Sequence, residues 1–226
     1  MADHVVFLFD VDNTLIDNDR IIADMMRHLE KDIGAESAKK YWEYFEEIRS
    51  EIGYADYLGA LQRYRINNPR DFHIVSVSRF LINYHFANRL MPGSLDVIDR
   101  FQQFGEVVIL SDGDMVFQPL KVERSSLDDA VDGKVMIYIH KEQELDDVAA
   151  RYPADHYVLI DDKIRILTAV KKIWGNKVTT VFPRQGHYAT DLKEVAKYPA
   201  ADVTIDRIDQ LLDYDLDRVL ASTSKG

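Results

Sequence analysis

The chain has 226 residues, of which 46% are hydrophobic, enough for one sizeable domain or for a core with a smaller second domain. Its formal net charge of −11 argues against a nucleic-acid partner, because binding a polyanion requires a basic face. It contains no cysteine, which excludes disulfides, zinc–thiolate sites and thiol nucleophiles.

The N-terminal segment MADHVVFLFD holds a short apolar run with acidic residues on both sides. It lacks the positively charged start and the long apolar region of a signal peptide. No apolar run in the sequence approaches the length needed to cross a membrane. We therefore expect a cytoplasmic protein without a membrane partner.

The first expected element is the uninterrupted apolar run VVFLF at residues 5–9, which is typical of a buried strand in a parallel sheet. Asp10 follows at once, where α/β sheets usually carry their functional sites. Asp12 lies two residues on, and the alternation of an extended chain directs both carboxylates the same way. Asn13 suits a turn, and Thr14 adds a hydroxyl group.

Residues 18–89 show helical periodicity and no convincing strand. We expect the first helix to end at Gly34 and the second near Gly53. The third ends at the NNP sequence of residues 67–69, and the fourth begins after Asp71. Four successive amphipathic helices predict a small helical bundle.

After Pro92 and Gly93 the pattern alternates between strand and helix. We expect strands at residues 107–110, 135–139, 157–160, 178–182 and 203–205. The helices expected between and around them cover residues 94–104, 142–151, 164–174 and 191–197, with a closing helix over Leu211 and Leu212. Such repeats predict a Rossmann-like α/β fold, a parallel sheet with helices on both faces. The resulting domains are a core of residues 1–16 and 91–226 and an inserted helical cap of residues 17–90, with a frayed tail at 222–226.

Two further predicted strands end in polar residues. The strand at 107–110 leads into Ser111, Asp112 and Gly113, which could hold a phosphate with a hydroxyl group and backbone N–H groups. The strand at 157–160 leads into Asp161 and Asp162, an adjacent pair that is costly without a cation or N–H donors. Each segment could also be an ordinary turn or helix start.

Clustered carboxylates at these strand ends would suit Mg²⁺, which prefers oxygen ligands and substrate phosphate oxygens. Asp10 could then attack phosphorus as a nucleophile, and Asp12 could serve as general acid and base.

The segment VVFLFDVDNTL resembles motif I of the haloacid dehalogenase superfamily, hhhDxDxT, in which h is apolar. Asp10, Asp12 and Thr14 match, and Asn13 stands where the family often has glycine. Ser111 resembles motif II. Motif III of the family is a Lys or Arg ahead of motif IV, near the start of a helix, and Lys141, just after the strand at 135–139, resembles it. Its ammonium group would offset the carboxylates, and Lys134, before that strand, is a less suitable candidate. The adjacent Asp161 and Asp162 resemble motif IV, although the second acid that some relatives place four residues later is missing here.

The resemblance implies a Mg²⁺-dependent phosphatase of a small phosphorylated metabolite, acting through an aspartyl-phosphate on Asp10. Thr14, Ser111 and Lys141 would join in catalysis. Asn13, Asp112 and Gly113 would contact the substrate. The metal would be held by Asp10, Asp161 and Asp162 and by the backbone carbonyl of Asp12. The protein would be a monomer or a homodimer.

Three alternatives stay open at this point. A 2-haloacid dehalogenase of the same superfamily needs no metal, but that branch lacks an acid at the position of Asp12. A phosphomutase shares the core residues and differs in the cap. A non-catalytic receiver-like module also phosphorylates an aspartate on a parallel sheet, but it is shorter and lacks a large helical insertion.

Several other polar residues have two interpretations. Asp114, Gln118 and Lys121 could reach a substrate or lie on a helix surface. The loop at residues 184–187 could line the rim of the site or be a plain connection.

Overall fold

The computed structural model describes residues 4–215 of the chain, so the predicted frayed tail lies outside the described residues. Six strands form one sheet: β1 (Val5–Phe9), β2 (Glu106–Asp112), β3 (Val135–Tyr138), β4 (His156–Ile160), β5 (Val178–Pro183) and β6 (Val203–Ile205). Their order is β3-β2-β1-β4-β5-β6, and every neighbouring pair is parallel. The predicted α/β fold with a parallel sheet is confirmed.

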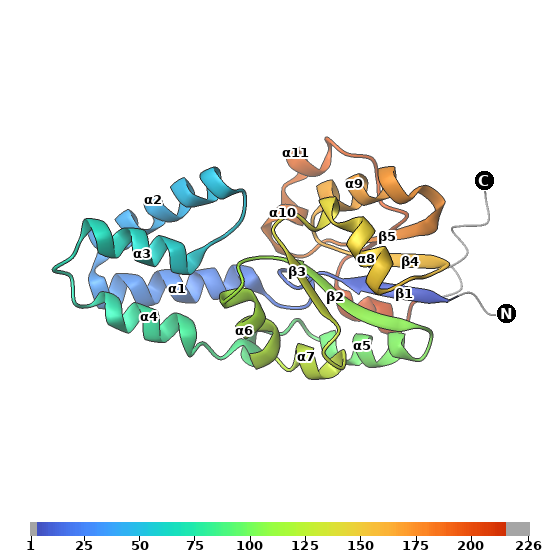
Figure 1. The fold of residues 1–226 in the computed structure, drawn as a ribbon, viewed down its shortest axis with the longest axis horizontal. Coiled ribbons are helices and arrows are strands. Elements are labelled where there is room, and N and C mark those ends of the chain that lie inside the picture. Colours follow the sequence, from blue (N-terminus) through green and yellow to red (C-terminus); the bar gives the residue numbers. More distant parts are fainter. Residues whose placement is uncertain (1–3, 216–226) are drawn as a thin grey trace.

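Alternate side chains of the central strands point to opposite faces of the sheet, and both faces are covered by helices (Figure 1). One face packs on α5 (Ser94–Gln102), α6 (Phe117–Arg124) and α7 (Leu127–Ala130). The other packs on α8 (Leu145–Arg151) and α9 (Ile164–Trp174). Two short helices, α10 (Gly186–Thr190) and α11 (Leu192–Val195), follow β5. This two-sided burial explains why β1 and β4 are apolar along their whole length.

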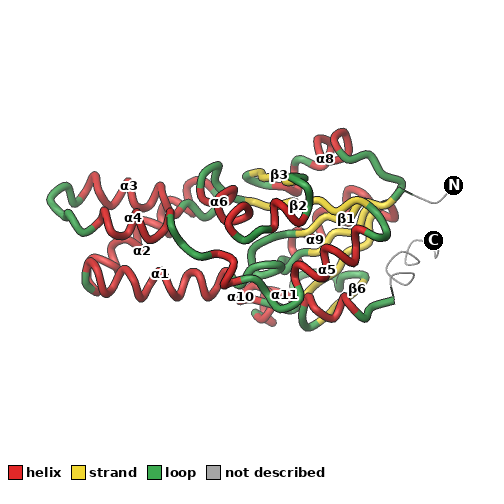
Figure 2. Tube along the Cα trace, turned by 90° about the horizontal axis from the view of Figure 1, so that it is seen from below, coloured by secondary structure: helices red, strands yellow, loops and turns green. Residues whose placement is uncertain are grey.

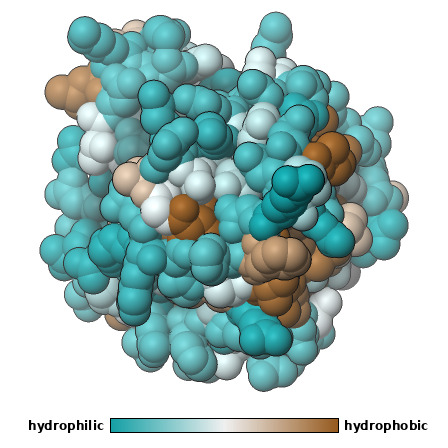
Figure 3. Space-filling model, turned by 90° about the vertical axis from the view of Figure 1, so that its left-hand side faces the viewer, coloured by the Kyte–Doolittle hydropathy of each residue, from teal (hydrophilic) through white to brown (hydrophobic). Residues whose placement is uncertain are grey.

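Four helices form a separate lobe, which we call the helical lobe: α1 (Asn18–Ile33), α2 (Ala35–Ile52), α3 (Tyr57–Asn67) and α4 (Ile74–Ile82). They extend away from one end of the sheet in both ribbon views (Figures 1 and 2). The surface at that end of the molecule is mostly hydrophilic, with a few separate apolar areas (Figure 3). No helix within residues 4–215 is both long and apolar enough to cross a membrane.

Two adjacent linkers join the helical lobe to the sheet. Ile16 on the outgoing linker and Leu90 on the returning one form an antiparallel bridge. On either side of it, Asp17 N donates to Arg89 O at 2.7 Å, and Met91 N donates to Leu15 O at 2.8 Å. The domain boundaries at residues 16–17 and 90–91 stay a prediction, but this is where the chain passes between the two parts.

Several predicted elements differ from the structure. The fourth helix begins at Ile74, with His73 rather than Asp71 before its first turn. The closing helix is a 3-10 helix over Ile208–Leu212. Two helices, α6 and α7, lie between β2 and β3. A helix surface was one of the two interpretations for Gln118 and Lys121, but no helix with bounds was predicted there. Further 3-10 helices cover Phe86–Arg89, Lys141–Gln143 and Gly175–Lys177.

Candidate active site

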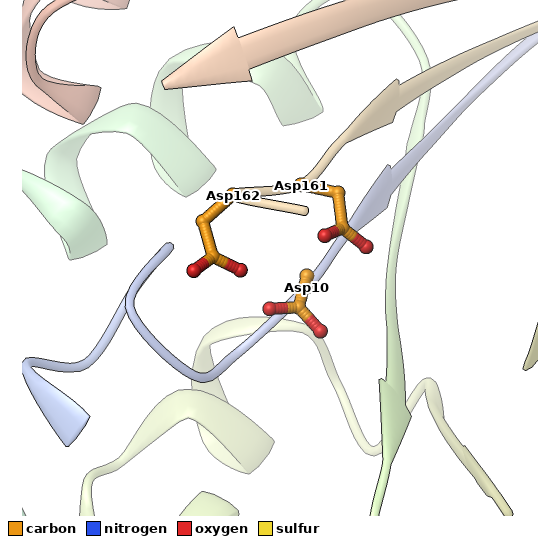
Figure 4. Close-up of side chains that lie close together, drawn as sticks. All are labelled: Asp10, Asp161 and Asp162. Carbon is orange, nitrogen blue, oxygen red and sulfur yellow. The ribbon is translucent and has the colours of Figure 1, made fainter. Parts of the chain in front are cut away.

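Three carboxylates meet where the central strands end. Asp10 follows β1, and Asp161 and Asp162 follow the neighbouring strand β4, whose Ile160 is the register partner of Phe9. All three side chains are buried, and each offers an oxygen within 4.8 Å of the others'. Figure 4 shows the three carboxylates turned toward one another. The register of the sheet therefore brings the predicted motif I and motif IV acids together.

One buried lysine partly balances this negative charge. The Nζ of Lys141 forms ion pairs with Asp10 and, at 2.7 Å, with Asp161. It also donates to the backbone oxygen of Leu110, while the Lys141 backbone N–H donates to Asp112 at 2.7 Å. Burial alone would lower the pKa of Lys141, but the carboxylates outweigh burial and raise the pKa. The ammonium group is therefore charged throughout the neutral range.

The negative charges of the two acids after β4, Asp161 and Asp162, are less well balanced by nearby positive charge. Burial raises the pKa of Asp161 to about 6, although Lys141 opposes the shift. Burial raises the pKa of Asp162 well above its usual value. Both carboxylate oxygens of Asp162 are buried without a hydrogen-bond partner among the described residues. Since an unpaired buried carboxylate is costly, Asp162 has the chemistry of a metal ligand.

Asp161 is engaged differently. Its Oδ1 accepts a hydrogen bond from the Lys163 backbone N–H at 2.8 Å, and its Oδ2 faces Lys141. Asp162 is thus the freer of the two acids, which the sequence alone left undecided. An oxygen-only donor set of Asp10, Asp162 and a nearby backbone carbonyl fits Mg²⁺ better than softer metals.

The predicted hydroxyl groups lie beside this cluster. Thr14 Oγ1 donates to Asp10 Oδ2 at 3.3 Å and accepts from the Asp162 backbone N–H at 3.1 Å. Ser111 is buried at the end of β2, and Gln118 Nε2 donates to its Oγ at 2.9 Å. A Cβ at Gly113 would lie 2.7 Å from Gln118, so glycine leaves room for this contact.

Asn13 holds the turn after β1. Its φ of 59° lies in the left-handed region, which asparagine tolerates and glycine favours. The structure therefore explains why asparagine can stand where related sequences often have glycine. Its side chain exchanges hydrogen bonds with Asp19, and Gln185 Nε2 donates to its backbone oxygen at 3.0 Å.

Asp12 has a different ion-pair partner from that of Asp10. Its Oδ1 lies 2.5 Å from Nζ of Lys121, a buried residue of α6. The same ammonium group donates to Asn18 Oδ1 at 3.0 Å. Asp12 thus lies outside the three-carboxylate cluster, on the side of the helical lobe.

Three further residues contact the site but were given no role from the sequence. Lys121 and Gln185 were noted without a decision on their roles, and Lys163 was not considered. Gln185 also donates to Thr14 O at 3.1 Å and so fixes the loop that carries Asp12. Lys163 lies beside the acids, with its Nζ 5.5 Å from the Tyr188 ring centroid. Its adjacency to the Asp161–Asp162 pair was the one signal available.

A cavity of about 500 Å³ opens above this site, between the helical lobe and the sheet ends. Asp12, Asn13, Asp112 and Gly113 lie at its core side. Residues of α1, α2 and α3 line the opposite side. The predicted substrate residues and Asp12 therefore border the cavity, whereas Asp10, Thr14, Ser111 and Lys141 are not among its lining residues.

Comparison with known proteins identifies the family. The model of the haloacid dehalogenase-like hydrolases matches residues 5–173, which is more than half of the chain. The chain belongs to this family. No curated protein matches the sequence.

Solved structures of haloacid dehalogenase-like proteins share the fold. A haloacid dehalogenase-like protein from Burkholderia xenovorans LB400 is 56% identical, with a TM-score of 0.90 over 94% of this chain and 99% of its own. The hydrolase YfnB from Bacillus subtilis, bound to magnesium, is 16% identical, with a TM-score of 0.62 over 96% and 99% of the chains. The L-2-haloacid dehalogenase from Xanthobacter autotrophicus, with chloropropionic acid covalently bound, is 14% identical, with a TM-score of 0.57 over 91% and 96%.

Proposed function

We propose that the protein is a cytoplasmic, Mg²⁺-dependent phosphohydrolase of a small phosphorylated metabolite. The observation that carries the proposal is the buried Asp10, Asp161 and Asp162 cluster, in which Asp162 has no partner for either carboxylate oxygen among the described residues. A divalent cation would satisfy that deficit and also bind a phosphate oxygen. The proposal is also supported by the chain's membership of a hydrolase family and by the fold that it shares with its relatives.

In the proposed reaction, Asp10 attacks phosphorus through a carboxylate oxygen and forms an aspartyl-phosphate as the alcohol leaves. Thr14, bonded to Asp10, is placed to hold that carboxylate in position. Lys141, charged and bonded to Asp10, would stabilise the negative charge that develops on the phosphoryl oxygens. Ser111 at the end of β2 would hold another of those oxygens.

Asp12 would protonate the leaving alkoxide and later remove a proton from the attacking water. Its position supports this role, because it faces the cavity side of the site while Asp10 faces the buried cluster. The second step releases phosphate from Asp10 and restores the carboxylate.

The residues that would hold Mg²⁺ are Asp10, Asp162 and the backbone carbonyl of Asp12, with Asp161 behind them. When bound, Mg²⁺ would neutralise carboxylate charge and polarise the phosphoryl group. The charge of Lys163 acts on Asp162, but no described group donates a hydrogen bond to either of its carboxylate oxygens, and Lys141 is shared between Asp10 and Asp161.

A 2-haloacid dehalogenase is the main competing function, because one structural relative carries that activity in its name. Asp12 argues against it, since a dehalogenase needs no acid to protonate a halide leaving group. A phosphomutase would use the same core residues and differ in the fate of the phosphoryl group. The hydrolase family disfavours a receiver-like module.

The deciding experiment combines a metal-supplemented screen of phosphate monoesters with an assay of halide release from 2-chloropropionate. We expect phosphate release with Mg²⁺, its loss in excess chelator, and no halide release. Asp10→Asn should reduce the rate to the assay background, because an amide is a poor nucleophile. Asp99→Asn, an exposed change in α5, is the matched control. Full activity in excess chelator, or halide release, would reject the proposal. Transfer of phosphate within a sugar phosphate without net release would identify a phosphomutase.

A further inference from the structure

The cavity above the site has an aromatic wall, which we define as Trp42, Phe45, Tyr57 and Phe117. The first three belong to the helical lobe, and Phe117 begins α6. Trp42 and Phe45 ring centroids are 5.2 Å apart, and Phe45 and Tyr57 are stacked at 4.9 Å. Tyr57 and Phe117 follow at 5.2 Å. These contacts join the four rings into one continuous surface.

One end of the aromatic wall lies beside the reacting groups. The Tyr57 ring contacts the ring of Phe117, the first residue of α6. The Phe117 ring centroid lies 5.7 Å from Nζ of Lys121, the partner of Asp12. A phosphate ester bound at Asp10 would therefore direct its alcohol part along the wall.

The three amide side chains that line the cavity already have partners. Asn13 exchanges hydrogen bonds with Asp19, Asn18 accepts one from Lys121, and Gln118 donates to Ser111. On the wall itself, the indole N–H of Trp42 is buried without a hydrogen-bond partner among the described residues. A polyol would find no free amide group among the three, whereas an apolar ring needs none.

The arginines at the cavity are paired. Arg165 pairs with Glu142 at 2.6 Å, and Arg49 contacts both Tyr188 and, at 3.6 Å, Glu46. Lys163 lies over the Tyr188 ring beside the acids of β4, so its charge is at the phosphoryl end of the cavity. The two arginines that line the cavity therefore do not provide an unpaired cation for a second anionic group of the substrate.

We propose that the substrate is a phosphate monoester whose alcohol carries an aromatic or other flat apolar ring, bound against the aromatic wall. This inference rests on the proposed phosphohydrolase function and names its substrate class. Apolar rings gain from burial and from offset or edge contacts with aromatic side chains. A cavity of about 500 Å³ also has room for such a ring beside the phosphoryl group.

The test compares 2-phenylethyl phosphate with ethyl phosphate and glycerol 3-phosphate at saturating Mg²⁺. All three lose a primary alkoxide, so differences in kcat/KM report recognition of the alcohol part. We expect the phenyl ester to be preferred by at least about tenfold, the lower end of what apolar pockets achieve for a single methylene group. Trp42→Leu and Phe45→Leu should each reduce this preference severalfold, and Trp42→Phe should largely keep it.

The preference is a ratio measured on one preparation, so it does not depend on how much of a variant is folded. Phe72→Leu is the matched control, because Phe72 is 83% exposed in the helical lobe and does not line the cavity. Equal kcat/KM for the three esters, or a preference for glycerol 3-phosphate, would overturn this inference and leave the phosphohydrolase proposal intact. An unchanged preference in both wall variants would also overturn it. Hydrolysis of no ester in Mg²⁺ would overturn the proposed function, and this inference with it.

Discussion

The ammonium group of Lys121 lies 2.5 Å from the carboxylate of Asp12 and 3.0 Å from Asn18 Oδ1. Asn18 is the first residue of α1, so one buried lysine joins the proposed acid/base to the start of the helical lobe. The orientation of Asp12 is therefore tied to the position of the lobe above the substrate.

Lys121→Met should lower kcat on an alkyl phosphate by about a hundredfold, because small displacements of a catalytic group have effects of that size. The methionine keeps most of the buried volume and removes the charge. Lys172→Met, an exposed change in α9, serves as the control. Steady-state kinetics on proteins with matching circular dichroism would check it. Wild-type kcat in Lys121→Met would show that Asp12 does not need this partner.

Asp12→Asn should slow formation of the aspartyl-phosphate far more for an alkyl phosphate than for a nitrophenyl ester. An alkoxide needs a proton to leave and a nitrophenolate does not, so the gap should be about a hundred- to ten-thousand-fold. Because the second step still lacks its base, the nitrophenyl ester should give a burst of phenolate and then stall. Stopped-flow absorbance measures both phases. Equal slowing with both esters at saturating Mg²⁺ would rule out Asp12 as the proton donor.

Asp162→Asn should abolish the rise in melting temperature that Mg²⁺ produces, because neither carboxylate oxygen of Asp162 has a hydrogen-bond partner among the described residues. Asp161→Asn should weaken that rise less, since Asp161 is already paired with Lys141. Differential scanning fluorimetry over a Mg²⁺ titration gives both values. A larger loss in Asp161→Asn would exchange the roles of the two acids.

Asp24 offers a test of stability and pH. Burial would raise its pKa, but hydrogen bonds from Tyr84 and Arg89 outweigh burial and lower the pKa below 3.8. A lowered pKa stabilises the folded state above the unfolded pKa, and this contribution is lost as pH falls through the folded value. Asp24→Asn should therefore cost about 1 kcal/mol at pH 7, and progressively less below about pH 4.

Urea unfolding of the wild type and of Asp24→Asn at pH 7 and at pH 3 would measure this difference. Asp99→Asn is again the control, because it removes a charge from an exposed position. A difference that stays constant between the two pH values would show that the ionised carboxylate is not the source of the stabilisation.

The sheet could be predicted from the sequence because its strands are buried on both faces. The predicted bounds of the first and last strands, Val5–Phe9 and Val203–Ile205, are the same as those in the structure. Lys141 was predicted to lie just after the strand that the structure has as β3. That position alone indicated that it lies near the acids. Its contacts with Asp10 and Asp161 depend on strand order, which the sequence pattern does not specify.

Helix α6 could not be predicted in the same way. Its buried residues are Phe117, Gln118, Lys121 and Val122, so half of its inward face is polar. A search for apolar periodicity reads such a face as exposed. The two polar residues are buried because Ser111 and Asp12 give them partners. Ser111 lies near the end of β2, and Asp12 lies in the loop after β1. Buried polar contacts between distant segments were therefore the part of the site that the sequence concealed.

The paired linkers at Ile16 and Leu90 have a consequence for how such proteins diversify. The chain leaves the sheet and returns to it at neighbouring points. The length of the segment between these points therefore does not affect the distance between β1 and β2. Residues 20–88 could be lengthened, shortened or exchanged in a chimera without a gap to close. In the proposed reaction, recognition of the alcohol and chemistry at phosphorus would thus belong to two parts of the chain that can be exchanged separately.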